Sequence, residues 1–241
     1  MKIKAIFFDL DGTLLPMDQD TFAKGYFKSI ALKMANHGYD PELLIKTIIK
    51  GTAQMVKNDG SRTNEDCFWE CFNKVFGERS DEQIRAFDEY YAENFDTNVQ
   101  FCKTNPKASQ TIKALQDRSY RLILATNPLF PPEATRKRIR WAGLTPEDFE
   151  LFTAYDNSSF CKPNLKYYSE ILEKTKLLPE ECLMVGNDIS EDMIAGQLGM
   201  KVFLITECLI NRENLDTACY PQGDFDDLLC YITELESKEE D

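Results

Sequence analysis

IKAIFFDLDGT, residues 3–13, combines a strand pattern with a turn that carries two acids. Its first six residues are mostly β-branched, aromatic or otherwise apolar, which predicts a buried strand. Open parallel sheets bind their ligands at the carboxyl ends of their strands, and Asp9 and Asp11 follow directly after this strand. Because residues i and i+2 of an extended segment share a face, both carboxylates can address one site.

The rest of the chain shows two patterns. About 80 residues after the first strand carry four helical patterns and no strand pattern. Helices then alternate with short apolar runs, which predicts βαβ units and a parallel sheet. We therefore predict an α/β fold with a Rossmann-like parallel sheet, interrupted after its first strand by a helical block. The later helices are expected at 106–117, 132–142, 164–176 and 190–198, the strands at 121–126, 151–154, 182–186 and 201–206, and a frayed acidic tail at 234–241.

Composition excludes several classes of function. The 241 residues include 41 acids, 28 Lys and Arg, and one His, for a formal charge of -13. A nucleic-acid partner or an anionic membrane surface would require a basic face, so we expect neither. One His makes Ser-His-Asp chemistry and multi-His metal sites poor candidates. The length fits one or two domains, and the sequence does not specify an oligomeric state.

Targeting signals and cysteines favour a cytoplasmic protein. The opening residues lack the apolar stretch of a signal peptide, and no run approaches the roughly 18 apolar residues of a membrane span. Eight cysteines are scattered without paired CxxC spacing. In a chain that we expect to stay in the cytoplasm, reduced and mostly buried thiols are the expectation.

A second acidic pair lies in GNDISED, residues 186–192, after another apolar strand pattern. Asp188 and Asp192 are one helical turn apart if a helix begins here. Together with Asp9 and Asp11 they would place three or four carboxylates at one edge of the sheet. Such a cluster usually requires a hard cation, and Mg²⁺ is the natural candidate because it accepts carboxylate, water and phosphate oxygens. The alternative for Asp188 and Asp192 is a capping turn. The alternatives for Asp9 and Asp11 are a capping turn or a fragment of a calcium loop.

Three further residues are candidates for the site because of their positions in the sequence: Thr126, Asn127 and Lys162. Thr126 and Asn127 end the strand pattern RLILA, and Lys162 stands before a helix in Lys162-Pro163. Taken alone, each is most simply an ordinary strand-end or solvated residue. The basic run at 136–140 is expected to form a solvated helix face. The aromatic residues of the third helical pattern are expected mostly to pack helices, with one or two lining a substrate pocket: Phe68, Trp69, Phe72 and Phe76.

The order of these motifs resembles the haloacid dehalogenase superfamily of phosphohydrolases. All four motifs of that superfamily occur after the expected elements, although Cys161 stands where a Gly often precedes the motif Lys. The resemblance implies an α/β catalytic core at 1–14 and 97–241. It also implies an α-helical cap over the active site at 15–96.

The resemblance also implies a mechanism. Asp9 would be the nucleophile that forms an aspartyl-phosphate, and Asp11 would be the general acid and base. Mg²⁺ would be held by Asp9, the backbone carbonyl of Asp11 and Asp188, with help from Asp192. The phosphate oxygens would be held by Thr126, Asn127 and Lys162. The expected partner is a small phosphorylated metabolite.

Three functions are compatible with these residues. The first is a magnesium-dependent phosphatase. The second is a phosphomutase that uses the same phosphoenzyme, and the third is a catalytically idle binding module. Halide displacement is the poorer interpretation, because the dehalogenases that name the superfamily lack the second acid, here Asp11.

Overall fold

The computed structural model describes residues 2–240, and its centre is a parallel sheet. Within these residues six strands are hydrogen-bonded in the order β3-β2-β1-β4-β5-β6, and every pair is parallel. The predicted fold class is confirmed. The strands are β1 (Ala5–Phe8), β2 (Arg121–Leu124), β3 (Leu151–Phe152), β4 (Cys182–Gly186), β5 (Lys201–Ile205) and β6 (Gln222–Gly223).

Helices cover both faces of this sheet. Alternate residues of β1 point to opposite faces, so each face packs against a different set of helices. Ala5 and Phe7 pack against α7, whereas Ile6 and Phe8 belong to the core shared with α5 and α8. All four are fully buried, which explains why the strand reads as a continuous apolar run. The core helices are α5 (Pro106–Asp117), α6 (Pro132–Trp141), α7 (Leu165–Thr175) and α8 (Phe225–Glu240).

Two expectations about the last hundred residues were wrong. The helix predicted at 190–198 is a 3₁₀ segment at Met193–Leu198. Residues 234–240 of the acidic tail predicted to fray are instead part of α8, which continues to Glu240, and Asp241 lies outside the described residues. Glu236 explains part of this order, since it accepts hydrogen bonds from Tyr120 Oη at 2.7 Å and from Arg118 Nη1 at 3.3 Å.

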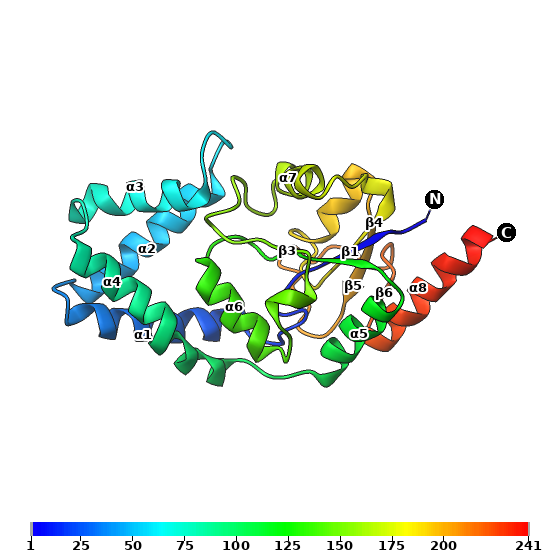
Figure 1. The fold of residues 1–241 in the computed structure, drawn as a ribbon, viewed down its shortest axis with the longest axis horizontal. Helices are drawn as coiled ribbons and strands as arrows, with labels where there is room; N and C mark the ends of the chain where they lie inside the picture. Colours follow the sequence, from blue (N-terminus) through cyan, green and yellow to red (C-terminus); the bar gives the residue numbers. More distant parts are fainter. Residues whose placement is uncertain (1, 241) are drawn as a thin grey trace.

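Four helices lie between β1 and α5, and Figure 1 shows them side by side, away from the sheet. Their starts follow the sequence signals, because Asp40 caps one helix and Ser80 begins a capping box with Gln83. A π-helical turn (Tyr90–Asn94) and a 3₁₀ segment (Phe95–Phe101) lead back to the core. The four helices are α1 (Gln19–Ala35), α2 (Pro41–Val56), α3 (Asn64–Phe76) and α4 (Asp81–Glu89).

We call α1–α4 the helical block. It contacts the core through aromatic rings, since the Tyr26 centroid in α1 lies 5.2 Å from that of Phe130. Phe95, in the 3₁₀ segment that leads back to the core, stacks on Trp141 of α6 at 5.2 Å. The two chain segments that connect the helical block to the core are hydrogen-bonded to each other, since Lys103 N donates to Pro16 O at 2.8 Å. The division into core and cap at 14/15 and 96/97 stays a prediction. No helix within residues 2–240 has the length and apolar character needed to cross a bilayer.

The topology places the candidate site beside β1. The chain runs from β1 into the helical block, then adds β2 on one side of β1 and β4 on the other. The carboxyl ends of β1 and β4 therefore form a topological switch point, where open parallel sheets bind ligands. Asp9 follows β1 here, and Asp188 follows β4.

Candidate active site

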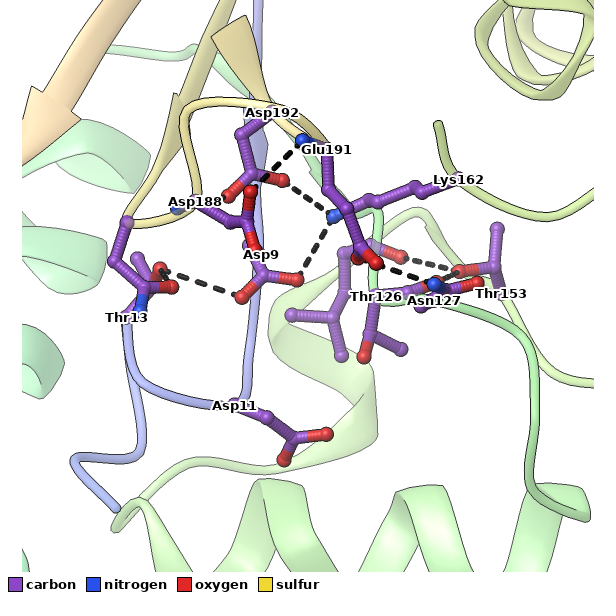
Figure 2. A network of polar contacts seen from close by, with 12 residues as sticks. Asp9, Asp11, Thr13, Thr126, Asn127, Thr153, Lys162, Asp188, Glu191 and Asp192 are labelled. Atoms are coloured by element: carbon purple, nitrogen blue, oxygen red, sulfur yellow. Dashed lines mark hydrogen bonds and ion pairs between the residues drawn. The ribbon is translucent and has the colours of Figure 1, made fainter. Parts of the chain in front are cut away.

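Lys162 joins the acids of two different motifs. Its Nζ lies 2.8 Å from Asp9 Oδ1 and 2.6 Å from Asp192 Oδ1, and Figure 2 shows the three side chains converging. The Lys162 residue is 1% exposed. A buried ammonium requires such partners, because an unpaired charge is very costly away from water. The structure thus brings together three of the predicted site residues.

The loop after β4 is held by its own acids. Asp188 Oδ1 accepts hydrogen bonds from the backbone N–H groups of Ser190 and Glu191, at 2.8 and 3.0 Å. Asp192 Oδ2 accepts from Asp188 N at 3.0 Å, so both carboxylate oxygens of Asp192 have protein partners. Gly186 permits this close packing, since an added Cβ would lie 2.1 Å from Asp192 Oδ2. These contacts favour an orienting role for Asp192 toward Lys162 and Asp188.

The turn after Asp9 is locked onto the same loop. Gly12 has φ +94°, and a Cβ there would lie 2.4 Å from Asn187 Nδ2. Thr13 Oγ1 lies 2.9 Å from Asn187 Oδ1 and 3.3 Å from Asp9 Oδ2, as a donor to both oxygens. The Gly of the first motif is therefore required both by its backbone conformation and by this approach.

Burial and charge shift the pKa values of the central pair in physically clear directions. Burial alone would lower the pKa of Lys162, but the Asp192 and Asp9 carboxylates outweigh it and hold that pKa well above its usual value. Burial raises the pKa of Asp192 to about 7, against the opposing effect of Lys162. Lys162 is therefore a permanent cation at this edge of the sheet.

Asp11 lies apart from that cluster. Its side chain points away from Asp9 in Figure 2, and its Oδ2 forms an ion pair with Arg138 of α6. Within residues 2–240 the buried Oδ1 of Asp11 has no hydrogen-bond partner. Burial raises the pKa of Asp11, although Arg138 acts in the opposite direction. One oxygen of this carboxyl group thus remains available to a ligand.

The expectation of a solvated face for the basic run at 136–140 was wrong for two of its four basic residues, whereas Arg140 is exposed and Arg136 is partly exposed. Arg138 is fully buried, and Lys137, which is 7% exposed, pairs with Asp96. Arg138 is one site residue that sequence reasoning missed. Its spacing of four from Ala134 and from Ala142, both buried, was the available signal, because residues four apart share a helix face.

Thr126 and Asn127 lie at the end of β2, as predicted. The backbone carbonyl of Thr126 is fixed by Thr153 Oγ1 at 2.6 Å and by Tyr167 Oη at 2.8 Å. Asn127 Nδ2 donates to Glu191 Oε2 at 3.1 Å. Glu191 was quoted within its motif but not selected as a site residue. Glu191 borders both cavities of the site, and burial raises its pKa.

Two cavities meet at this place. A small polar cavity of about 30 Å³ is bordered by Asp9, Thr126 and the acids of the β4 loop. A larger cavity of about 320 Å³ extends between the core and the helical block. Four residues border both cavities: Asp11, Gln19, Asn127 and Glu191. Asp11 is therefore placed between a polar compartment and a larger, mostly apolar one.

The oxygen donors of the polar cavity fit Mg²⁺. Among residues 2–240 no three His, Cys, Asp or Glu side chains form a preformed metal cluster. Mg²⁺ does not require one, because it binds through one or two carboxylates and keeps water or phosphate oxygens as further ligands. Asp9 and Asp188 supply two carboxylates here, and Asp11 also borders the cavity.

Comparison with known proteins agrees with this geometry. Residues 3–199 match the family model of haloacid dehalogenase-like hydrolases. The chain is 30% identical over 215 residues to a glyceraldehyde 3-phosphate phosphatase from Methanothermobacter thermautotrophicus, covering 88% of this chain and 89% of that one. It is 26% identical to the pyrophosphatase PpaX of Oceanobacillus iheyensis, covering 82% and 80%.

The fold has solved counterparts. The crystal structure of a predicted phosphoglycolate phosphatase from Haemophilus somnus superimposes with a TM-score of 0.58 at 21% identity, covering 96% of this chain and 98% of that one. This likeness concerns the fold alone. The family match, however, spans most of the chain and includes both acidic motifs. The chain therefore belongs to the haloacid dehalogenase-like hydrolase family.

Proposed function

We propose that this hydrolase is a magnesium-dependent phosphatase that cleaves small phosphate monoesters through an aspartyl-phosphate on Asp9. The observation that carries the proposal is the position of Asp11 between the two cavities. The polar cavity supplies carboxylate oxygens for a cation, and Thr126 and Asn127 border it as hydrogen-bond donors for a phosphoryl group. The larger cavity has room for the alcohol that leaves, so Asp11 borders the oxygen that must receive a proton.

In the first step, Asp9 attacks phosphorus and the bond from phosphorus to the leaving oxygen breaks. Lys162 sits within 2.8 Å of Asp9 Oδ1 and supplies positive charge where the transferred oxygens accumulate negative charge. Asp11, in its protonated form, gives its proton to the leaving oxygen. The products of this step are a free alcohol and the aspartyl-phosphate.

In the second step, Asp11 is a carboxylate and takes a proton from water. The water oxygen attacks phosphorus, the bond to Asp9 breaks, and inorganic phosphate leaves. Thr126 and Asn127 border the polar cavity and supply hydrogen-bond donors for the phosphate oxygens. Asp192 keeps Lys162 in place throughout both steps.

Mg²⁺, held by Asp9, Asp188 and the Asp11 backbone carbonyl, would lower the repulsion between the nucleophile and the phosphate. The names of the curated relatives support small substrates, since one relative acts on glyceraldehyde 3-phosphate and another on pyrophosphate. A phosphomutase would use the same first step and would differ only in the acceptor of the phosphoryl group. The presence of Asp11 favours phosphoryl transfer over halide displacement.

The test is release of inorganic phosphate with Mg²⁺ over a panel of phosphorylated metabolites and p-nitrophenyl phosphate. We expect Asp9→Asn to abolish release, and EDTA to abolish it until Mg²⁺ is restored. Asp117→Asn is the matched control, because Asp117 is an exposed acid at the end of α5. Release that survives both Asp9→Asn and EDTA would contradict the mechanism. Isomerised substrate without free phosphate would identify a mutase instead.

A further inference from the structure

The larger cavity has an unusual wall for an enzyme of phosphorylated compounds. Nine aromatic side chains border it, from both the core and the helical block. Phe130 and Tyr155 belong to the core, whereas Phe27, Phe68 and Trp69 belong to the helical block. Of the four aromatic residues of α3, Phe68 and Trp69 border this cavity, whereas Phe72 is fully buried.

Charge is distributed unevenly along this wall. Among residues 2–240, no Lys, Arg or His borders the larger cavity. Its acids are Asp11 and Glu191 at the junction with the polar cavity, and the exposed Asp20. A carboxylate or second phosphate in this space would lose its hydration without gaining a cationic partner, which is costly.

The volume argues that the cavity receives a ligand. Protein interiors are close-packed, and an empty apolar space of this size lowers stability through lost contacts. The cavity holds about 320 Å³, within the range of small-molecule sites. It shares Asp11, Gln19, Asn127 and Glu191 with the polar cavity, and Oδ1 of Asp11 is buried without a partner within residues 2–240. The occupant is therefore joined to the phosphoryl group.

We propose that the substrate is a phosphate monoester whose leaving alcohol bears no negative charge and carries an aromatic or similarly sized apolar group. This inference rests on the proposed function and adds the chemical class of the leaving group. The ring lies among the aromatic side chains of the helical block and Phe130. The ester oxygen lies beside Asp11, and the phosphoryl group lies in the polar cavity.

Three alkyl phosphates with the same two-carbon linker test this class. They are 2-phenylethyl phosphate, 3-phosphonooxypropanoate and choline phosphate, which end in a phenyl, a carboxylate and a trimethylammonium group. We expect kcat/KM to be about 10- to 100-fold higher for the phenyl compound, the gain from burying one ring. A preference for the carboxylate or the ammonium compound would overturn the inference.

A change of charge inside the cavity makes the test sharper. Thr52 of α2 borders the cavity and is far in sequence from all four motifs. Thr52→Arg is expected to raise kcat/KM for 3-phosphonooxypropanoate at least about tenfold relative to 2-phenylethyl phosphate, because it supplies the missing cation. Thr52→Met adds similar bulk without charge and should not favour the carboxylate. An unchanged substrate ratio in Thr52→Arg would count against the inference.

Binding of the product alcohols separates this inference from the proposed function. Saturation-transfer NMR should detect 2-phenylethanol on the protein, but not choline or 3-hydroxypropanoate. This measurement needs no turnover. Binding of 2-phenylethanol without phosphate release from any ester would refute the proposed function alone. Phosphate release with no binding of 2-phenylethanol would refute the leaving-group class alone.

Discussion

Replacement of Arg138 by Met tests whether this buried arginine positions Asp11 for proton transfer. Arg138 pairs with Asp11 Oδ2 and is itself held by Thr135 Oγ1 at 3.2 Å and by the Phe130 ring at 4.5 Å. Met retains most of the buried volume and removes the charge. The Asp11 carboxyl group then loses the contact that fixes its direction, while the Asp9 and Lys162 contacts remain.

The expected magnitudes follow from burial. Removal of one partner of a buried ion pair costs about 3–5 kcal/mol. The Asp11 side chain is 21% exposed and can recruit water, so we expect about 3 kcal/mol, the lower end of that range. In a chain of this size that corresponds to a fall of about 6–12 °C in Tm. Loss of a fixed side-chain direction is worth about 0.5–1.5 kcal/mol, or about twofold to tenfold in rate.

The assay compares two leaving groups. p-Nitrophenolate leaves without a proton, whereas an alkoxide such as that of 2-phenylethanol requires one from Asp11. We expect Arg138→Met to lower kcat/KM about twofold to tenfold for 2-phenylethyl phosphate and much less for p-nitrophenyl phosphate. kcat/KM is the appropriate quantity because it reports the first phosphoryl transfer. Arg138→Lys, which keeps the charge, should restore part of the difference.

Three results would refute this reasoning. An equal loss for both substrates would show that Arg138 only supports the fold. A further loss when Arg138→Met is added to Asp11→Asn would show that Arg138 acts other than through Asp11, since coupled residues are not additive. Faster turnover of the alkyl ester would show that the ion pair restrains Asp11 instead.

Two further predictions concern packing and thiols. Gly25→Ala should lower the free energy of unfolding, measured in urea, by about 1–3 kcal/mol. A Cβ at Gly25 would lie 2.0 Å from the Phe101 ring and overpack the contact between this ring and the helix that carries Gly25. Helix propensity alone predicts about 1 kcal/mol of stabilisation, so a more stable variant would exclude the clash. Ellman's reagent should modify three thiols rapidly in the native protein, at the exposed Cys208, Cys219 and Cys230. A fourth rapid thiol among the buried cysteines would contradict the packing.

The sequence was sufficient to place the candidate residues that lie at the ends of their own strands. Asp9, Thr126 and Asp188 each follow an apolar run, and the parallel order of the strands brings their ends together. Lys162 was placed only through the order of the motifs, yet it contacts two acids from different motifs. Local pattern and topology therefore account for the polar cavity.

Long-range partners could not be predicted in the same way. The Arg138–Asp11 pair joins residues 127 positions apart, and no local pattern indicates which acid a buried arginine meets. The prediction of a solvated helix face failed in the same region, because three consecutive basic residues are typical of such a face. Thiol burial was also overestimated, since three of the eight cysteines are exposed and one more is partly exposed. The aromatic cavity depends on how two groups of helices pack.

The balance of charge in the site explains how a chain of formal charge -13 can bind an anion. Within residues 2–240, five acids border the polar cavity, namely Asp9, Asp11, Asp188, Glu191 and Asp192, whereas its neighbouring cations are Lys162 and Arg138. Three of those acids have raised pKa values, chiefly through burial. A dianionic phosphate would be repelled by this set. One divalent cation offsets most of this excess negative charge, so we expect metal binding to precede substrate binding.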